Sequence, residues 1–68
     1  MLVELKAEVM ARREDGSFVT LKVGTGIDYS CRKRDDGKWV HTFTAFDPKN
    51  SHKILTYIEV GPDRPNWL

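Results

Sequence analysis

The chain has 68 residues, a single cysteine, 31% charged residues and a formal net charge of +1. So short a chain forms one domain with a thin core, and one cysteine excludes an intrachain disulfide and is typical of a reducing compartment, so we expect a cytoplasmic protein. No apolar run approaches the roughly 20 residues of a membrane-spanning helix, and we expect neither a signal peptide nor a membrane role. The small net charge also argues against a strongly basic nucleic-acid binder.

A turn motif occurs twice in the chain, and both copies place an Asp-Gly pair between extended apolar segments. Residues 12–19 read basic pair, acidic pair, glycine, spacer, aromatic, valine, and residues 33–40 repeat this order. Asp-Gly between alternating hydrophobic runs is a strong short-range signal for a β-hairpin. The repeat therefore predicts two hairpins, which define most of the fold.

Apolar alternation on both sides of the first Asp-Gly pair also predicts the loop length. Odd-numbered residues are apolar in residues 3–11 and again in residues 19–23, so both strands present one face to the core. Pairing odd with odd positions requires a three-residue loop, Glu14-Asp15-Gly16, with Ala11 opposite Val19. Such a loop is a type I turn followed by a G1 bulge, in which Gly16 takes the left-handed conformation.

Gly24-Thr25-Gly26 predicts a third reversal, which pairs residues 18–23 with a strand at about 27–34. In that pairing Phe18 faces Arg32, and a ring lies beside a guanidinium. The second Asp-Gly hairpin then leads into a strand at about 39–46. Three tight turns in succession predict a four-stranded antiparallel meander.

The end of the chain adds one strand and a tail. Residues 47–51, Asp-Pro-Lys-Asn-Ser, are typical of a turn or a single helical turn, because Asp caps a helix and Pro suits its first position. Residues 54–60 read as the fifth strand. We therefore expect one all-β domain over residues 1–60 and a tail over residues 61–68. The expected architecture is a small five-stranded antiparallel barrel that is SH3-like, or alternatively OB-like, with a short helical turn between strands 4 and 5.

The orientation of Trp39 is the point on which the two signals disagree. The repeat places Trp39 outward like Phe18, its equivalent in the first copy, whereas alternation with Ile27 places it inside. A β-bulge between Arg32 and Phe43 would reconcile the two. Without the bulge Trp39 belongs to the core, and we favour this interpretation because buried tryptophans are common in small β-domains.

Basic side chains near the two Asp-Gly turns are the main functional signal. We expect these turns to lie at one end of the meander, where the cations gather around Phe18 and, with a bulge, Trp39. Cations that contact phosphates and rings that stack on bases are the two components of single-strand nucleic-acid binding, although acidic residues in both turns neutralise part of the charge. The expected nucleic-acid-binding residues are Arg12, Phe18, Lys22, Arg32, Arg34, Lys38 and Trp39.

A protein interface is the alternative. The strand at 54–60 is partly apolar on both faces, which leaves its edge open to a partner strand or to a second copy in a homodimer. The tail ends in Trp67-Leu68, which either docks on a partner or packs over the open end of the barrel, and the thin core favours packing. The residues of this alternative site are Leu55, Tyr57, Trp67 and Leu68.

Catalysis and metal binding have little support in the sequence. Cys31 and His41 would face each other across two strands, but a nucleophile also needs an orienting group and a metal needs further ligands. His52 is the only other histidine. We expect no enzymatic activity, no metal and no cofactor. The chain is interpreted as a small binding module that engages nucleic acid, or alternatively as a protein-binding adaptor or inhibitor of the kind found among phage and plasmid regulators.

Overall fold

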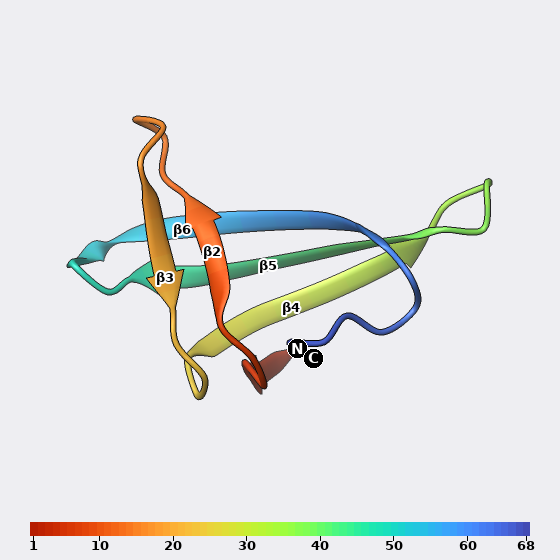
Figure 1. Ribbon diagram of the computed structural model, residues 1–68, viewed down its shortest axis with the longest axis horizontal. Coiled ribbons are helices and arrows are strands. Elements are labelled where there is room, and N and C mark those ends of the chain that lie inside the picture. Colours follow the sequence, from red (N-terminus) through yellow and green to blue (C-terminus); the bar gives the residue numbers. More distant parts are fainter.

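A computed structural model describes residues 1–68 and shows an all-β chain without a helix. Four strands form one antiparallel sheet in the order β1-β4-β5-β6, and a separate β2-β3 hairpin crosses it (Figure 1). The two sheets do not close into a barrel, and no helix is present that could span a membrane. The strands are β1 (Leu2–Glu4), β2 (Val9–Arg12), β3 (Phe18–Leu21), β4 (Gly26–Lys33), β5 (Trp39–Asp47) and β6 (Asn50–Gly61).

The first predicted strand is divided between the two sheets. Where the sequence predicts one strand, the chain bends between β1 and β2. The Leu5 N–H donates to the Thr25 carbonyl (2.9 Å), and the Leu5 carbonyl accepts from the Gly24 N–H (2.9 Å). The Lys6 N–H donates to the Trp67 carbonyl (2.7 Å). These long-range bonds hold the bend, while the odd-numbered side chains still face the core on both sides of it.

The first Asp-Gly loop has the predicted geometry. The Arg13 N–H donates to the Ser17 carbonyl (2.7 Å), and the Gly16 N–H donates to the Arg13 carbonyl (3.0 Å). Gly16 has a φ of +90°, which a residue with a Cβ adopts only under strain. Ala11 lies opposite Val19, so the predicted loop type and register are confirmed.

The second Asp-Gly loop repeats the first bond for bond. The Arg34 N–H donates to the Lys38 carbonyl (2.7 Å), the Gly37 N–H donates to the Arg34 carbonyl (3.1 Å), and Gly37 has a φ of +87°. In both copies the second acidic residue accepts the backbone N–H two positions later, here from Lys38 to Asp36 (3.0 Å). The sequence repeat is therefore a structural repeat of the loop.

The reversal at Gly24-Thr25-Gly26 forms, but it joins two sheets instead of two paired strands. Gly24 has a φ of +91° and occupies the turn. Beyond the turn β4 pairs with β1 on one side and β5 on the other, so no edge of β4 is left for β3. The predicted meander and the predicted pairing of Phe18 with Arg32 are therefore wrong.

β5 and β6 form the longest hairpin and connect through a tight turn. Phe46 pairs with Ile54, and after a register irregularity Asp47 pairs with Asn50. Only Pro48 and Lys49 remain between the paired residues. The sequence allows either a turn or a single helical turn in this segment, and the structure has the turn. The short helical turn expected between these strands is not present.

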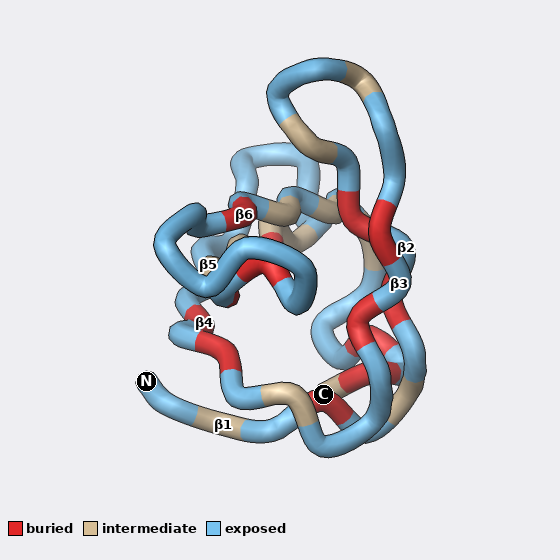
Figure 2. Tube along the Cα trace, turned by 90° about the vertical axis from the view of Figure 1, so that its left-hand side faces the viewer, coloured by how far each residue is buried: buried red, intermediate tan, exposed pale blue.

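The core lies between the β2-β3 hairpin and the facing side of the four-stranded sheet, with the tail included (Figure 2). Trp67 is 2% exposed. Its ring centroid lies 5.7 Å from that of Tyr29, 5.1 Å from Phe43, 6.0 Å from Tyr57 and 6.1 Å from His41. The tail therefore packs into the core. The buried hydrophobic residues are Leu5, Val9, Ala11, Val19, Leu21, Ile27, Tyr29, Phe43, Ala45, Leu55 and Trp67.

Trp39 follows the alternation and not the repeat. The β4–β5 register runs without interruption from Cys31 opposite His41 to Lys33 opposite Trp39, so there is no bulge between residues 32 and 43. Trp39 shares the face of His41, but it is only half-buried because β5 extends beyond the core. Phe18 is 60% exposed. The two copies of the turn lie in different sheets, so equivalent residues need not share a face.

Candidate nucleic-acid interface

The basic residues predicted to form one cluster lie on two separate hairpins. The β2–β3 loop and the β4–β5 loop project at different ends of the molecule (Figure 1), whose longest dimension is 36 Å. Arg12 and Phe18 belong to the first hairpin, and Lys22 follows it. Arg32, Arg34, Lys38 and Trp39 lie on or beside the second. The expectation that the two loops share one end of the sheet is wrong, because it depended on the meander.

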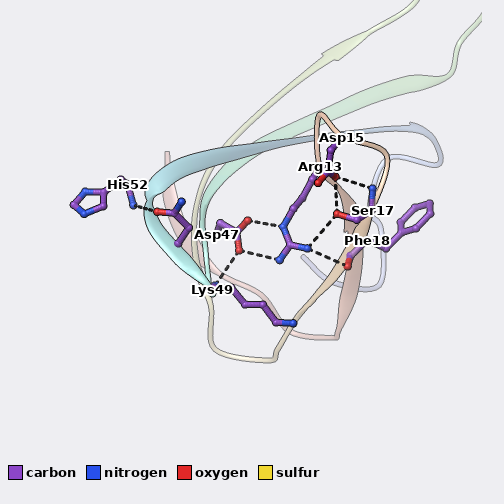
Figure 3. A network of polar contacts seen from close by, with 8 residues as sticks. Arg13, Asp15, Ser17, Phe18, Asp47, Lys49 and His52 are labelled. Carbon is purple, nitrogen blue, oxygen red and sulfur yellow. Dashed lines mark hydrogen bonds and ion pairs between the residues drawn. The ribbon is translucent and has the colours of Figure 1, made fainter.

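At the first hairpin, Arg13 forms an ion pair that ties the loop to β5 (Figure 3). Its Nε donates to Asp47 Oδ2 (2.6 Å) and its Nη2 to Asp47 Oδ1 (3.1 Å). Its Nη1 also reaches Ser17 Oγ (3.3 Å) and the Phe18 carbonyl (3.4 Å). Asp47 accepts the Lys49 N–H as well (2.9 Å). A guanidinium with this many acceptors is committed to the fold and is not free to bind a phosphate.

The same contacts change the protonation of both partners. Asp47 is only 4% exposed. The hydrogen bonds from Arg13, and then the Lys49 N–H, lower the pKa of Asp47 from 3.8 to about 2. The hydrogen bond to Asp47 raises the pKa of Arg13 in turn. The ion pair therefore stabilises the folded state only while Asp47 is ionised.

Substitution of Asp47 by asparagine is expected to remove part of the acid sensitivity of the fold. Because the folded pKa lies below the unfolded one, this stabilisation is complete above about pH 5 and is lost as the pH falls toward about 2. Asp47→Asn should therefore be less stable than the wild type near neutral pH, and the difference should shrink in acid. Urea unfolding of both proteins near neutral pH and in acid measures this difference in the free energy of unfolding. Asp35→Asn, in the exposed second loop, is the control, and an Asp47→Asn deficit that persists unchanged in acid would rule out the ionic explanation.

The second hairpin extends beyond the core as a two-stranded ribbon, which we call the β4–β5 ribbon (residues 31–39). Every residue from Cys31 to Lys38 is exposed, so neither face of the ribbon tip is covered. The register places Arg32, Arg34 and Lys38 on the outer face of the four-stranded sheet, the side away from the β2–β3 hairpin. Lys33 lies on the opposite face of the ribbon.

Two acidic residues at the tip reduce the charge of the ribbon without cancelling it. Asp36 pairs with Arg34 (3.1 Å) and accepts the Lys38 N–H, so its carboxylate is held in the loop. Asp35 takes part in no ion pair or side-chain hydrogen bond. Four cations and two carboxylates leave the ribbon with an excess of two positive charges, although the whole chain carries only +1.

Trp39 lies at the base of the ribbon, on the face opposite the arginines. Its neighbours across the strands are Lys33 and Gly61. A Cβ at Gly61 would meet no atom within 4 Å, so the position across the strands from Trp39 is open. Phe18 lies on the other hairpin, and the two rings predicted to stack on bases do not share a surface.

The residues of the alternative protein interface lie mainly in the core. Leu55 and Trp67 are buried, and Tyr57 and Leu68 are half-buried. The Tyr57 hydroxyl (2.6 Å) and Trp67 Nε1 (3.3 Å) both donate to Glu59 Oε1, and burial, followed by the Glu59 bond, raises the pKa of Tyr57 to about 12. These four side chains therefore form part of the fold.

The sequence indicates that residues 54–60 are apolar on both faces, but the candidate site residues chosen from it leave out the outward-facing ones. The even-numbered residues of β6 point outward, and Ile54 and Ile58 are 62% and 63% exposed. Phe46 lies across from Ile54 and Val60 from Val40 on the same face. The signal was present in the mixed pattern of residues 54–60, in which both parities are apolar. A hollow of about 500 Å³ lies at the far end of this face, between Leu2, Phe46 and Ile54.

Cys31 and His41 lie opposite each other as expected, but they differ in environment. Cys31 is exposed, whereas His41 is fully buried. The Tyr29 hydroxyl lies 2.6 Å from His41 Nδ1, and His41 Nε2 lies 2.7 Å from the Pro62 carbonyl, to which it donates. Burial is the main reason that the pKa of Tyr29 is raised to about 12. Both ring nitrogens of His41 are thus occupied: Nδ1 by Tyr29 of β4, and Nε2 by the start of the tail.

No protein-family model matches the chain, and no curated protein or solved structure is significantly similar to it.

Proposed function

We propose that the protein is a non-enzymatic binding module that engages duplex DNA through the β4–β5 ribbon. The observation that carries the proposal is the exposure of residues 31–38 on both faces of a hairpin that carries four cationic side chains. A hairpin that only completed a core would not need to extend so far beyond it.

Duplex DNA fits this geometry better than other nucleic acids do. The major groove of B-DNA admits a two-stranded β-ribbon, whereas the corresponding groove of A-form RNA is too narrow. Arg32, Arg34 and Lys38 share one face and would contact phosphates of one strand, and guanidinium groups do so in a bidentate manner. Lys33 and Trp39 face the other way. Single-strand stacking has weaker support, because Trp39 and Phe18 are far apart.

A protein-binding adaptor that uses the interface residues predicted from the sequence has less support than the nucleic-acid-binding module. It relies on Leu55, Tyr57, Trp67 and Leu68, and these side chains stabilise the core instead of forming an exposed patch. The exposed apolar residues of β6 lie on the opposite face of that strand.

Binding of a fluorescently labelled DNA duplex over a range of salt concentrations tests the proposal. The triple variant Arg32→Ala, Arg34→Ala, Lys38→Ala should bind weakly even at low salt. Its slope of log affinity against log salt should be smaller by about three, since each phosphate contact contributes about −0.9. The charge-matched control replaces three exposed cations elsewhere, Arg12, Lys22 and Lys49, and should keep the wild-type slope.

Three outcomes would overturn the proposal. One is an absence of binding by the wild type to duplex DNA at low salt. The second is an equal loss in both triple variants, which would mean that binding follows net charge and not the ribbon. The third is a preference for single-stranded DNA or for RNA over the duplex.

A further inference from the structure

We propose that the chain forms a homodimer in which β6 pairs antiparallel with β6 of a second copy, with Thr56 on the two-fold axis. β6 is an edge strand of the four-stranded sheet and, with 12 residues, its longest strand. The other edge strand, β1, has only three residues. The paired strands would join the two sheets into one continuous eight-stranded sheet.

The register of the strands shows which residues of β6 direct their backbone N–H and C=O groups toward its free edge. The Tyr29 N–H donates to the Met1 carbonyl, so odd-numbered residues of β4 bond toward β1 and even-numbered ones toward β5. Hydrogen-bonded positions alternate along an antiparallel ladder, so odd-numbered residues of β5 and β6 bond to each other. The even-numbered residues from Ile54 to Val60 therefore direct their N–H and C=O groups away from the sheet. No backbone hydrogen bond outside the ladder involves them.

This edge has little of the usual protection against pairing. Natural edge strands are interrupted by proline, bulges or inward-pointing charges. β6 has no proline, and its only register irregularity lies at the turn, before Ile54. Its charged residues on the core face are Lys53 and Glu59, and the Glu59 carboxylate accepts hydrogen bonds from Tyr57 and Trp67. The β2–β3 hairpin crosses the core face of β6 without any backbone hydrogen bond to it. A row of unpaired donors and acceptors thus stays accessible beside exposed isoleucines.

The side chains of β6 favour the register centred on Thr56. In this register Ile54 lies opposite Ile58 of the second copy on the outer face, and Ile58 opposite the second copy's Ile54. On the other face Lys53 lies opposite Glu59 of the second copy, so that opposite charges meet twice. An axis at Tyr57 would instead place Ile58 opposite Thr56 and Lys53 opposite Gly61. A second copy is therefore an occupant that matches the strand in both apolar contact and charge.

The molecular mass in solution tests the dimer. Sedimentation or light scattering of the wild type should give twice the monomer mass of 7.8 kDa. Thr56→Pro removes an outward N–H and no ladder bond, and proline is tolerated at strand edges, so this variant should be a folded monomer. Thr56→Val keeps the N–H and should remain a dimer. A wild type that stays at the monomer mass at every accessible concentration overturns the proposal.

Cross-linking tests the register without relying on proline. In a Cys31→Ser background, Thr56→Cys should form a disulfide-linked dimer under mild oxidation, because the two Thr56 backbones would be paired directly. Ile58→Cys should form no such dimer. The two cysteines at position 58 would lie about 13 Å apart along the paired strands, beyond disulfide reach. Thr20→Cys, exposed on β3, reports random collisions. Equal cross-linking at positions 56, 58 and 20 would reject the paired edge.

Discussion

Replacement of Trp67 by alanine is expected to remove a large part of the free energy of unfolding. Trp67 is 2% exposed and contacts rings from β4, β5 and β6. Deleting so large a buried side chain costs about 3–5 kcal/mol. Domains of this length have only about 3–10 kcal/mol of stability, so the loss is comparable to the total. Circular dichroism with urea titration measures the change in the free energy of unfolding.

Trp39→Ala is the matched control for this prediction. Trp39 is half-buried beyond the end of the core, so its truncation should cost about 1 kcal/mol, as for ordinary substitutions. Trp67→Phe should lie between the two, because it keeps an aromatic side chain but loses the bond from Nε1 to Glu59. If Trp67→Ala unfolded at the same urea concentration as Trp39→Ala, the tail could not be part of the core.

Replacement of His41 by alanine is expected to produce the second large loss. The imidazole is fully buried between the Tyr29 hydroxyl and the Pro62 carbonyl. Its removal leaves a cavity and a buried hydroxyl without a partner, at a combined cost of about 3 kcal/mol. It also releases the start of the tail that carries Trp67. The melting temperature should fall by more than about 10 °C, which differential scanning fluorimetry detects.

The other histidine provides the comparison. His52 is exposed near the start of β6, and only its backbone N–H bonds, to Asn50 Oδ1. His52→Ala should leave the melting temperature unchanged within error. Equal melting temperatures for the two alanine variants would contradict the assignment of His41 as the anchor of the tail.

Local features of the fold could be predicted from the sequence, because each depends on residues close together in the chain. Alternation identified the core face on both sides of the Asp-Gly turns. Parity specified the three-residue loop and the left-handed Gly16, and the strands at 27–34 and 39–46 correspond to β4 and β5. The all-β class follows from the same periodicity.

The features that could not be predicted depend on contacts between distant residues. The bend between β1 and β2 is held by bonds from Leu5 to the Gly24–Thr25 turn and from Lys6 to Trp67. Nothing in residues 3–12 marks a break, since the alternation continues through it. A prediction that lacks this bend gives a meander and omits the pairing of β4 with β1.

The candidate site depended on the same error. The cations of each turn were correctly located along the chain, but their grouping required the topology. Because the two turns belong to different sheets, Arg12 and Phe18 lie apart from Arg32 and Arg34. The commitment of Arg13 to Asp47 likewise joins residues 34 positions apart.

The second hairpin, and not the first, is proposed to contact nucleic acid. Backbone amide chemical shifts of the labelled protein, recorded during titration with a DNA duplex, distinguish the two hairpins. The shifts of residues 31–39 should change, whereas those of residues 12–18 should stay as in the free protein. Changes concentrated in residues 12–18, or spread evenly over both hairpins, would contradict the proposal.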